Sequence, residues 1–386
     1  MAGTQDALAV GDLVELEADR IAHGGHVVGR APNGQVVFVR HALPGERVTV
    51  RVTEAGARFV RADAVAVHEA SPYRVAPPCP LAHPDGCGGC DFQHVALDEQ
   101  RRLKAAVVRE QLQRLAGIDC AVEVEAVPVP GRPDDGLGWR TRMQYVTPPD
   151  DHNGAKGLRK HRSHEVVVVR RCLIAAPGAR EPGPGTVEEP VLGRSFTVTS
   201  DGFWQVHPEA PRVLVETVLD QLRPQPGERV VDLYAGVGLF AAFLAGAVGE
   251  QGSAVAVEGD RTAARHAEGN LADLPQAEVV ADRVDRWLQR ETRRRRPVQA
   301  DLLVLDPPRT GARRAVVDRV AAVGPRAVAY VACDPAALAR DLGYFADRGY
   351  RLSRLRALDL FPMTHHVECV ALLEKTASDL GRSESA

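Results

Sequence analysis

Two side chains could do covalent chemistry, because each is a reactive group at the end of an apolar segment. Cys333 follows the apolar run 327–332 and comes two residues before Pro335, next to a helix start. A thiol at this place could be a nucleophile, although a free cysteine is also a common buried packing residue. Glu368 lies in an apolar strand pattern, where burial would raise the pKa of its carboxyl and suit it to accept a proton near neutral pH. The alternative for Glu368 is an acid on the solvent face of that strand.

A glycine-rich turn supplies a candidate binding site. Residues 232–238 read Asp-Leu-Tyr-Ala-Gly-Val-Gly, between a predicted strand and a predicted helix. Gly236 and Gly238 let the backbone turn tightly and approach a ligand closely. Glu258 ends the next predicted strand, where a carboxylate can accept hydrogen bonds from both ribose hydroxyls, and Asp282 after the third strand could receive an adenine amine. The third glycine of a dinucleotide fingerprint is absent, which disfavours NAD.

Strands and helices alternate from about residue 196 onward, which predicts a doubly wound α/β sheet. The segment 359–366 between the last two strands is too short for a crossover helix, so these two strands should be antiparallel. The seven predicted strands are 229–233, 254–258, 278–281, 302–306, 327–332, 351–358 and 367–373.

The N-terminal half has a different pattern. Short β-rich runs separated by glycine-containing turns predict a small closed barrel over residues 8–69, of the kind that often binds oligonucleotides. Residues 70–190 form a β-rich central domain with a helix over 98–116, and the Gly- and Pro-rich stretch 176–190 is interpreted as a linker. The catalytic domain is placed at 191–375, followed by a disordered tail at 376–386.

Four cysteines have the spacing of a metal site. Cys87 and Cys90 form a C-x2-C pair, Cys79 precedes them with seven residues in between, and Cys172 lies far downstream. The chain has no basic-then-apolar export signal and no apolar run long enough to span a bilayer, so it is expected to stay in the cytoplasm, where thiols remain reduced. Four thiolates suit zinc and an iron–sulfur cluster equally.

Charge alone leaves the partner open. The net charge is −3, but residues 20–61 carry seven arginines against two acids, and residues 151–180 carry seven Lys or Arg and three His against two acids. Such local basic faces could contact RNA. Of the 48 basic residues 44 are arginine, as a compositionally biased genome would also give, so RNA binding and an ordinary solvated surface are both consistent with the charge pattern.

In combination, these motifs resemble the RNA uridine-C5-methyltransferases that carry an N-terminal TRAM barrel. The resemblance covers residues 8–375 and rests on four segments in this order: Asp-Leu-Tyr-Ala-Gly-Val-Gly, Asp-Pro-Pro-Arg, Ala-Cys-Asp-Pro-Ala-Ala-Leu-Ala-Arg-Asp and His-His-Val-Glu. It implies S-adenosylmethionine as methyl donor, Cys333 as nucleophile and Glu368 as base. The cofactor-binding residues that it implies are Gln205, Tyr234, Gly236, Gly238, Glu258, Asp282 and Asp306.

The same resemblance implies a [4Fe-4S] cluster on Cys79, Cys87, Cys90 and Cys172, with zinc as the alternative. The insertion 81–86 makes the first gap between cysteines longer than in the family. Barrel and cysteine cluster occur together in the branch that modifies ribosomal RNA, so ribosomal RNA is the expected partner and transfer RNA the alternative. A monomer is the default expectation.

The implied chemistry requires both reactive residues. Carbon 5 of uracil is a weak nucleophile, and addition of the Cys333 thiolate to carbon 6 would activate it, after which Glu368 would remove the carbon 5 proton. Methylation of an exocyclic amine is a second interpretation, since Asp306 begins an Asp-Pro-Pro motif, but it leaves Cys333 and Glu368 without a role. A noncatalytic RNA-binding or ribosome-assembly protein is the alternative from a different class.

Overall fold

The computed structural model describes residues 7–149, 154–294 and 298–376. The predicted tail lies outside the described residues except for Thr376, as do residues 151–153 of the basic stretch. The chain divides into two compact units. The first unit comprises residues 1–107, 128–179 and 361–366, and the second comprises 108–127, 180–360 and 367–386.

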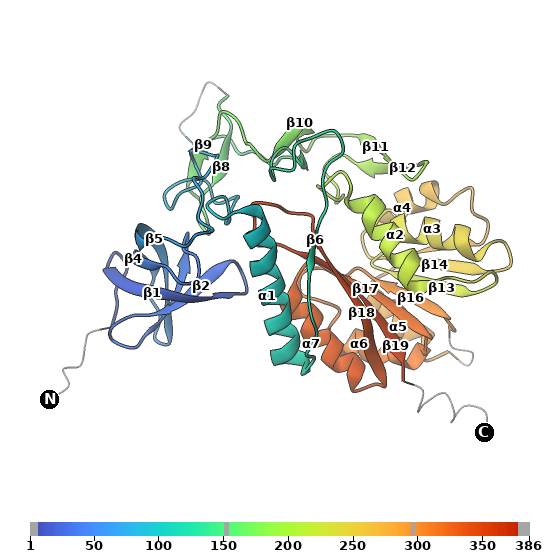
Figure 1. The fold of residues 1–386 in the computed structure, drawn as a ribbon. Coiled ribbons are helices and arrows are strands. Elements are labelled where there is room, and N and C mark those ends of the chain that lie inside the picture. The colour runs from blue at the N-terminus through green and yellow to red at the C-terminus, as the bar shows by residue number, and fades with distance from the viewer. Residues whose placement is uncertain (1–6, 150–153, 295–297, 377–386) are drawn as a thin grey trace. The chain divides into compact units, whose positions relative to one another are not determined.

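Five strands of the first unit close into a barrel with the order β1-β2-β3-β5-β4 (Figure 1). Neighbouring strands are antiparallel except β3 and β5, which are parallel. The predicted closed barrel is therefore confirmed, with β2 as an additional strand. The barrel strands are β1 (Leu13–Ala22), β2 (His26–Arg30), β3 (Val36–Arg40), β4 (Arg47–Glu54) and β5 (Phe59–Glu69).

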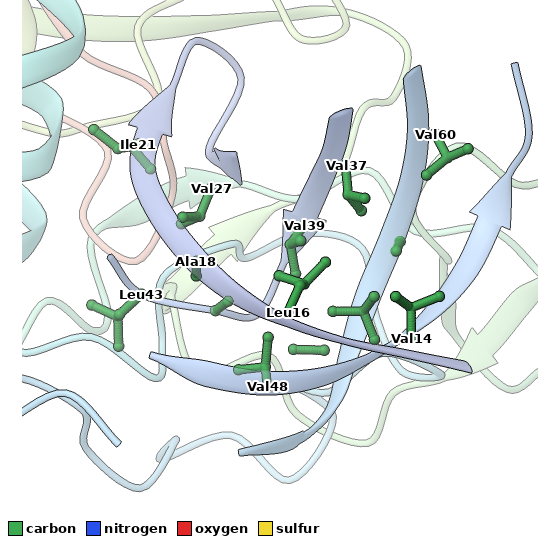
Figure 2. Close-up of a cluster of buried hydrophobic side chains, with 14 of the residues drawn as sticks. Val14, Leu16, Ala18, Ile21, Val27, Val37, Val39, Leu43, Val48 and Val60 are labelled. Atoms are coloured by element: carbon green, nitrogen blue, oxygen red, sulfur yellow. The ribbon is translucent and has the colours of Figure 1, made fainter. Parts of the chain in front are cut away.

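Every second side chain along the strands points into the barrel, and these apolar side chains form its core (Figure 2). Val14, Leu16 and Ala18 of β1 are buried, whereas the residues between them are exposed. This is the period of two that a strand with one buried face requires. Leu16 pairs with Val48 of β4, so the branched side chains of facing strands meet in the interior.

The rest of the first unit has little regular structure. The predicted helix is α1 (Leu97–Ala116), whose residues after Val107 are assigned to the second unit, and it ends at Gly117, whose φ is +65°. Two short two-stranded sheets follow. They pair β7 (Arg140–Arg142) with β10 (Ala175–Arg180), and β8 (Gly157–Arg159) with β9 (Val166–Val168).

The predicted linker at 176–190 contains the division between the two units, after residue 179, and most of it is strand. Strand β10 covers its start, and β11 (Thr186–Val191) forms an antiparallel hairpin with β12 (Arg194–Thr199). Proline is tolerated in such a hairpin because a strand without a second neighbour has a free edge. Pro190 pairs with Ser195 in this hairpin.

An eight-stranded sheet organises the second unit, in the order β15-β14-β13-β16-β17-β19-β18-β6. Seven of these strands were predicted. The eighth, β6, was not, because its three residues carry no periodicity; it pairs in parallel with β18. Strand β19 is antiparallel to both of its neighbours, as predicted for the last strand. The strands are β6 (Val124–Ala126), β13 (Arg229–Leu233), β14 (Ser253–Glu258), β15 (Ala277–Ala281), β16 (Leu302–Leu305), β17 (Ala327–Ala332), β18 (Tyr350–Asp359) and β19 (Glu368–Lys375).

The helices follow the double winding of the sheet. The chain runs from β13 outward through β14 to β15 and then returns to β16 on the other side of β13. In such sheets ligands bind beyond the carboxyl ends of the strands, where the winding reverses. This rule points to the loops after β13 and β16. The helices are α2 (Ala210–Leu222), α3 (Leu239–Val248), α4 (Arg261–Asn270), α5 (Val284–Glu291), α6 (Arg313–Val323) and α7 (Pro335–Ala346).

Candidate functional site

The pairing of β17 with β19 brings the two reactive residues together. Ala332 pairs with Cys369 in antiparallel register, so the next step of the ladder sets Cys333 opposite Glu368. Side chains directly opposite each other in antiparallel strands lie on the same face, with Cβ atoms about 5 Å apart. The thiol and the carboxyl are therefore neighbours, although they lie 35 positions apart in the sequence.

Cys333 lies just before α7. Asp334 caps this helix by accepting a hydrogen bond from the backbone N–H of Ala337 at 2.8 Å, and Pro335 begins the helix. A helix N-terminus favours a thiolate. Burial and the nearby charge of Glu368 outweigh this effect and raise the pKa of Cys333 to about 12, opposed by Arg309. In the free protein the thiol is protonated at neutral pH.

Glu368 is buried, with 3% of its surface exposed, so the solvent-facing alternative for this residue is wrong. Burial raises the pKa of its carboxyl well above the ordinary value, and the charge of Asp306 raises it further, whereas Arg309 lowers it. This direction is the one that a general base working near neutral pH requires.

Three further carboxyl groups lie along the same edge of the sheet. Burial raises the pKa of Asp232 to about 8, with contributions from Asp306 and Glu258, and burial raises the pKa of Asp306 to about 7. Asp306 and Glu258 raise the pKa of Asp232 because like charges repel. Such a row of carboxyl groups is an environment that favours a cationic ligand.

The glycine-rich turn and Glu258 form one side of a cavity of about 580 Å³. The carboxylate of Glu258 accepts hydrogen bonds from the backbone N–H of Gly236 at 2.8 Å and of Asp260 at 2.6 Å. Gly236 has a φ of +56° and a Cβ there would meet nothing within 4 Å, so this glycine is required by backbone conformation and leaves open space above the turn. The cavity size is within the range of small-molecule sites.

The other predicted cofactor residues lie around this turn but do not line the cavity. Asp282 follows β15, one residue beyond the register partner of Glu258, and its carboxylate accepts a hydrogen bond from Arg290 Nη1 at 2.8 Å. Gly238, with φ +88°, begins α3. Tyr234 has a φ of +66°, and burial raises the pKa of its hydroxyl to about 12. Asp306 follows β16 and is half-buried.

Gln205 follows the segment that closes the cavity from its other side. Asp201, Gly202 and Phe203 line the cavity, and the ring of Phe203 is 72% exposed. Trp204 is buried, with its ring 6.0 Å from that of Phe196, and anchors the segment to β12. Gln205 is half-buried next to this anchor.

The four cysteines line one cavity of about 380 Å³ in the first unit. Burial raises the pKa of Cys90 to about 12, and the neighbouring Cys172 and Cys87 raise it further. Buried thiols that raise one another's pKa fit a cationic group, which would stabilise their thiolates. Among the described residues, no three His, Cys, Asp or Glu side chains are arranged to hold a single metal ion. The basic side chains lining this cavity are Arg140, Arg159, Lys160, Arg162 and Arg171.

Sequence reasoning assigned no role to Arg309. The exposed Arg309 follows the Asp-Pro-Pro turn, and its charge lowers the pKa of both Cys333 and Glu368. The signal was in the sequence, where Arg309 is the charged residue that ends the Asp-Pro-Pro-Arg segment.

Comparison with known proteins agrees with this geometry. The chain matches the TRAM domain family over residues 8–65 and the tRNA (Uracil-5-)-methyltransferase family over residues 190–376. A Streptomyces avermitilis protein described as an uncharacterized RNA methyltransferase is 43% identical, in an alignment that covers 96% of this chain and 100% of the relative. A Bifidobacterium longum protein with the same description is 35% identical and covers 94% and 96% of the two chains.

The chain belongs to the TRAM-containing RNA (uracil-5-)-methyltransferase family. It is an S-adenosylmethionine-dependent RNA methyltransferase, and its barrel is the TRAM domain. The crystal structure of Pyrococcus abyssi tRNA (uracil-54, C5)-methyltransferase in complex with S-adenosyl-L-homocysteine has the same fold, with a TM-score of 0.67 at 21% identity, over 93% of this chain and 99% of that one. No helix in the described part of the methyltransferase has the length and apolarity to cross a membrane.

The raised pKa of the thiol predicts how Cys333 reacts in the free methyltransferase. Since the thiol is protonated up to a pH of about 12, its thiolate fraction should rise about tenfold for each pH unit between 7 and 9. The rate of alkylation of Cys333 by iodoacetamide, followed on its peptide by mass spectrometry, should therefore rise without a plateau in this range. A plateau below pH 8 would show that the helix N-terminus outweighs burial.

Proposed function

We propose that this methyltransferase methylates carbon 5 of a uridine in RNA through a covalent adduct at Cys333. The supporting observation is the register of β17 and β19, which sets a thiol opposite a buried carboxyl at the ligand-binding edge of the sheet. Methylation of an exocyclic amine would use neither group. A noncatalytic RNA-binding protein would have no use for a buried carboxyl whose burial opposes its charge.

The thiolate sulfur of Cys333 adds to carbon 6, and the electrons of the C5–C6 double bond move to the carbonyl oxygen at carbon 4 as an enolate. Carbon 5 then attacks the methyl group of S-adenosylmethionine. The bond between this methyl group and the sulfonium sulfur breaks, and the rest of the donor leaves as S-adenosylhomocysteine. Glu368 removes the proton from carbon 5, the double bond re-forms, and the bond between carbon 6 and sulfur breaks to release the thiolate. Uridine loses one proton and gains one methyl group.

Arg309 and the methyl donor prepare the site for this reaction. The guanidinium opposes the upward pKa shifts of Cys333 and Glu368, and the positively charged sulfonium of the donor would act in the same direction. The donor would be held by Gly236, Gly238 and Glu258, with the other predicted residues Gln205, Tyr234, Asp282 and Asp306 around it. Glu258, already oriented by two backbone N–H groups, would accept the ribose hydroxyls.

We propose further that Cys79, Cys87, Cys90 and Cys172 hold a [4Fe-4S] cluster. Their thiols line one cavity, so all four can face a single bound group. The basic residues around this cavity suit the negative charge of a thiolate-ligated cluster. The cluster would fix the loop that carries three of the cysteines.

Ribosomal RNA is the target that we propose, in the cytoplasm and with the protein as a monomer. Transfer RNA is the alternative, because the Pyrococcus abyssi enzyme is a tRNA (uracil-54, C5)-methyltransferase. Mapping of 5-methyluridine in ribosomal and transfer RNA from cells that lack the protein distinguishes the two.

The covalent mechanism makes opposite predictions for its two residues. Cys333→Ala should abolish methyl transfer while S-adenosylhomocysteine affinity is retained, because the thiol is not part of the donor cavity. Glu368→Gln should accumulate an RNA–protein adduct that survives denaturing electrophoresis, because the amide cannot remove the proton from carbon 5. Matched controls are Cys120→Ala, at a half-buried cysteine, and Glu374→Gln, on the same strand as Glu368. The mechanism would be contradicted if Cys333→Ala methylated RNA at the normal rate. It would also be contradicted if denaturing electrophoresis of Glu368→Gln showed only protein without attached RNA.

The metal proposal is tested on anaerobically purified protein. It should be coloured and contain about four iron atoms and as many acid-labile sulfides per chain. Cys172→Ser should lose most of this iron, since it removes one of four ligands, and Cys120→Ser should retain it. A colourless protein that contains one zinc per chain would overturn the iron assignment.

A further inference from the structure

The segment that leads into Glu368 is anchored by residues that the reaction does not use. Residues 361–366 join β18 to β19 and belong to the first unit, whereas Glu368 begins β19 of the second. Within the first unit, the backbone N–H of Phe92 donates to Met363 O at 3.0 Å, and the buried Gln100 accepts from Met363 N at 2.8 Å. Lys104, also buried, donates to Phe361 O at 3.0 Å.

His365 makes a further side-chain contact on this segment, three residues before the base. Its Nδ1 lies 2.6 Å from a carboxylate oxygen of Asp91. Asp91 directly follows Cys90 and ends the loop that carries Cys79, Cys87 and Cys90, which we call the cysteine loop. Arg40 of the TRAM barrel lies 4.0 Å from the other oxygen of the same carboxylate. His365 is thus tied to the cysteine loop by a hydrogen bond whose partners are largely shielded from water.

The barrel contacts His365 from another side. Gly25, in the turn between β1 and β2, has a φ of +76°, and a Cβ added there would lie 2.7 Å from the Cβ of His365. Such an approach leaves no room for a methyl group at residue 25. Gly34, in the next turn of the barrel, has a φ of +85° but a Cβ added there would meet nothing within 4 Å.

We propose that His365 is a positioning residue that fixes the backbone leading into the base. Its hydrogen bond with Asp91 and its close approach to Gly25 hold the chain three residues before Glu368, and the backbone carries this constraint directly from residue 365 to the base. A displacement of about 1 Å in a reacting group can cost about 100-fold in rate. This inference rests on the proposed role of Glu368 as base.

His365→Ala is the direct test. At saturating RNA, kcat should fall about 10- to 100-fold, while the KM for RNA and the affinity for S-adenosylhomocysteine change by less than about twofold. The covalent adduct should build up during turnover, because the step that Glu368 performs is slowed, and amide hydrogen exchange over residues 361–366 should increase. His365→Asn keeps a donor toward Asp91 and should restore most of the lost rate.

The glycine pair gives a second test that leaves His365 in place. Gly25→Ala and Gly34→Ala impose the same backbone strain, but only the first intrudes on His365. Gly25→Ala should lower kcat and Gly34→Ala should not, and Gly25→Ala should add little in a protein that already carries His365→Ala. Suppose that Glu368→Gln accumulates the adduct. The inference is then overturned if His365→Ala and Gly25→Ala both have the kcat of the wild type and accumulate no adduct. If Glu368→Gln forms no adduct, the proposed function fails instead.

Discussion

The antiparallel pairing of β17 and β19 is the constraint on which the chemistry depends. The neighbouring strands in the run β15-β14-β13-β16-β17 are all parallel to one another. Parallel strands present only their carboxyl ends to the ligand-binding edge. Because β19 runs in the opposite direction, it presents its first residue there, and Glu368 comes opposite Cys333. A shift of the register by one residue would turn one of the two side chains to the other face of the sheet.

Burial determines the electrostatics of this pair. Water is excluded from Glu368, and the carboxyl groups of Asp306 and Asp232 lie along the same edge, so the pKa values of these groups and of the thiol are all raised. The raised pKa values favour the protonated forms of these carboxyl groups and of the thiol in the free protein, so the reaction must remove a proton from the thiol of Cys333 before its sulfur can add to the ring. Arg309 is the residue that opposes this for both reacting groups, which explains why an arginine follows the two prolines.

Much of the fold could be predicted from the sequence, because strands rich in apolar residues, such as 229–233 and 327–332, end at the residues expected. Strand β6 could not, since three residues have no period, and the strands within the predicted linker were missed because glycine and proline are also compatible with hairpin edges. The site residues were located by motif. The direction of the thiol's pKa shift depends first on burial and then on the charge of Glu368, and both arise only in the folded sheet. The pairing of Asp91 with His365 spans 274 residues and has no local signal at all.

The central claim is that the sulfur of Cys333 bonds to the uracil ring. RNA in which 5-fluorouridine replaces uridine tests it most directly, because a fluorine at carbon 5 leaves no proton to remove and the methylated adduct cannot resolve. With S-adenosylmethionine present, the account predicts a denaturation-stable complex of one RNA per protein, with the nucleotide attached to the peptide that contains Cys333. A complex attached to another residue, or no stable complex while ordinary RNA is methylated, would contradict it.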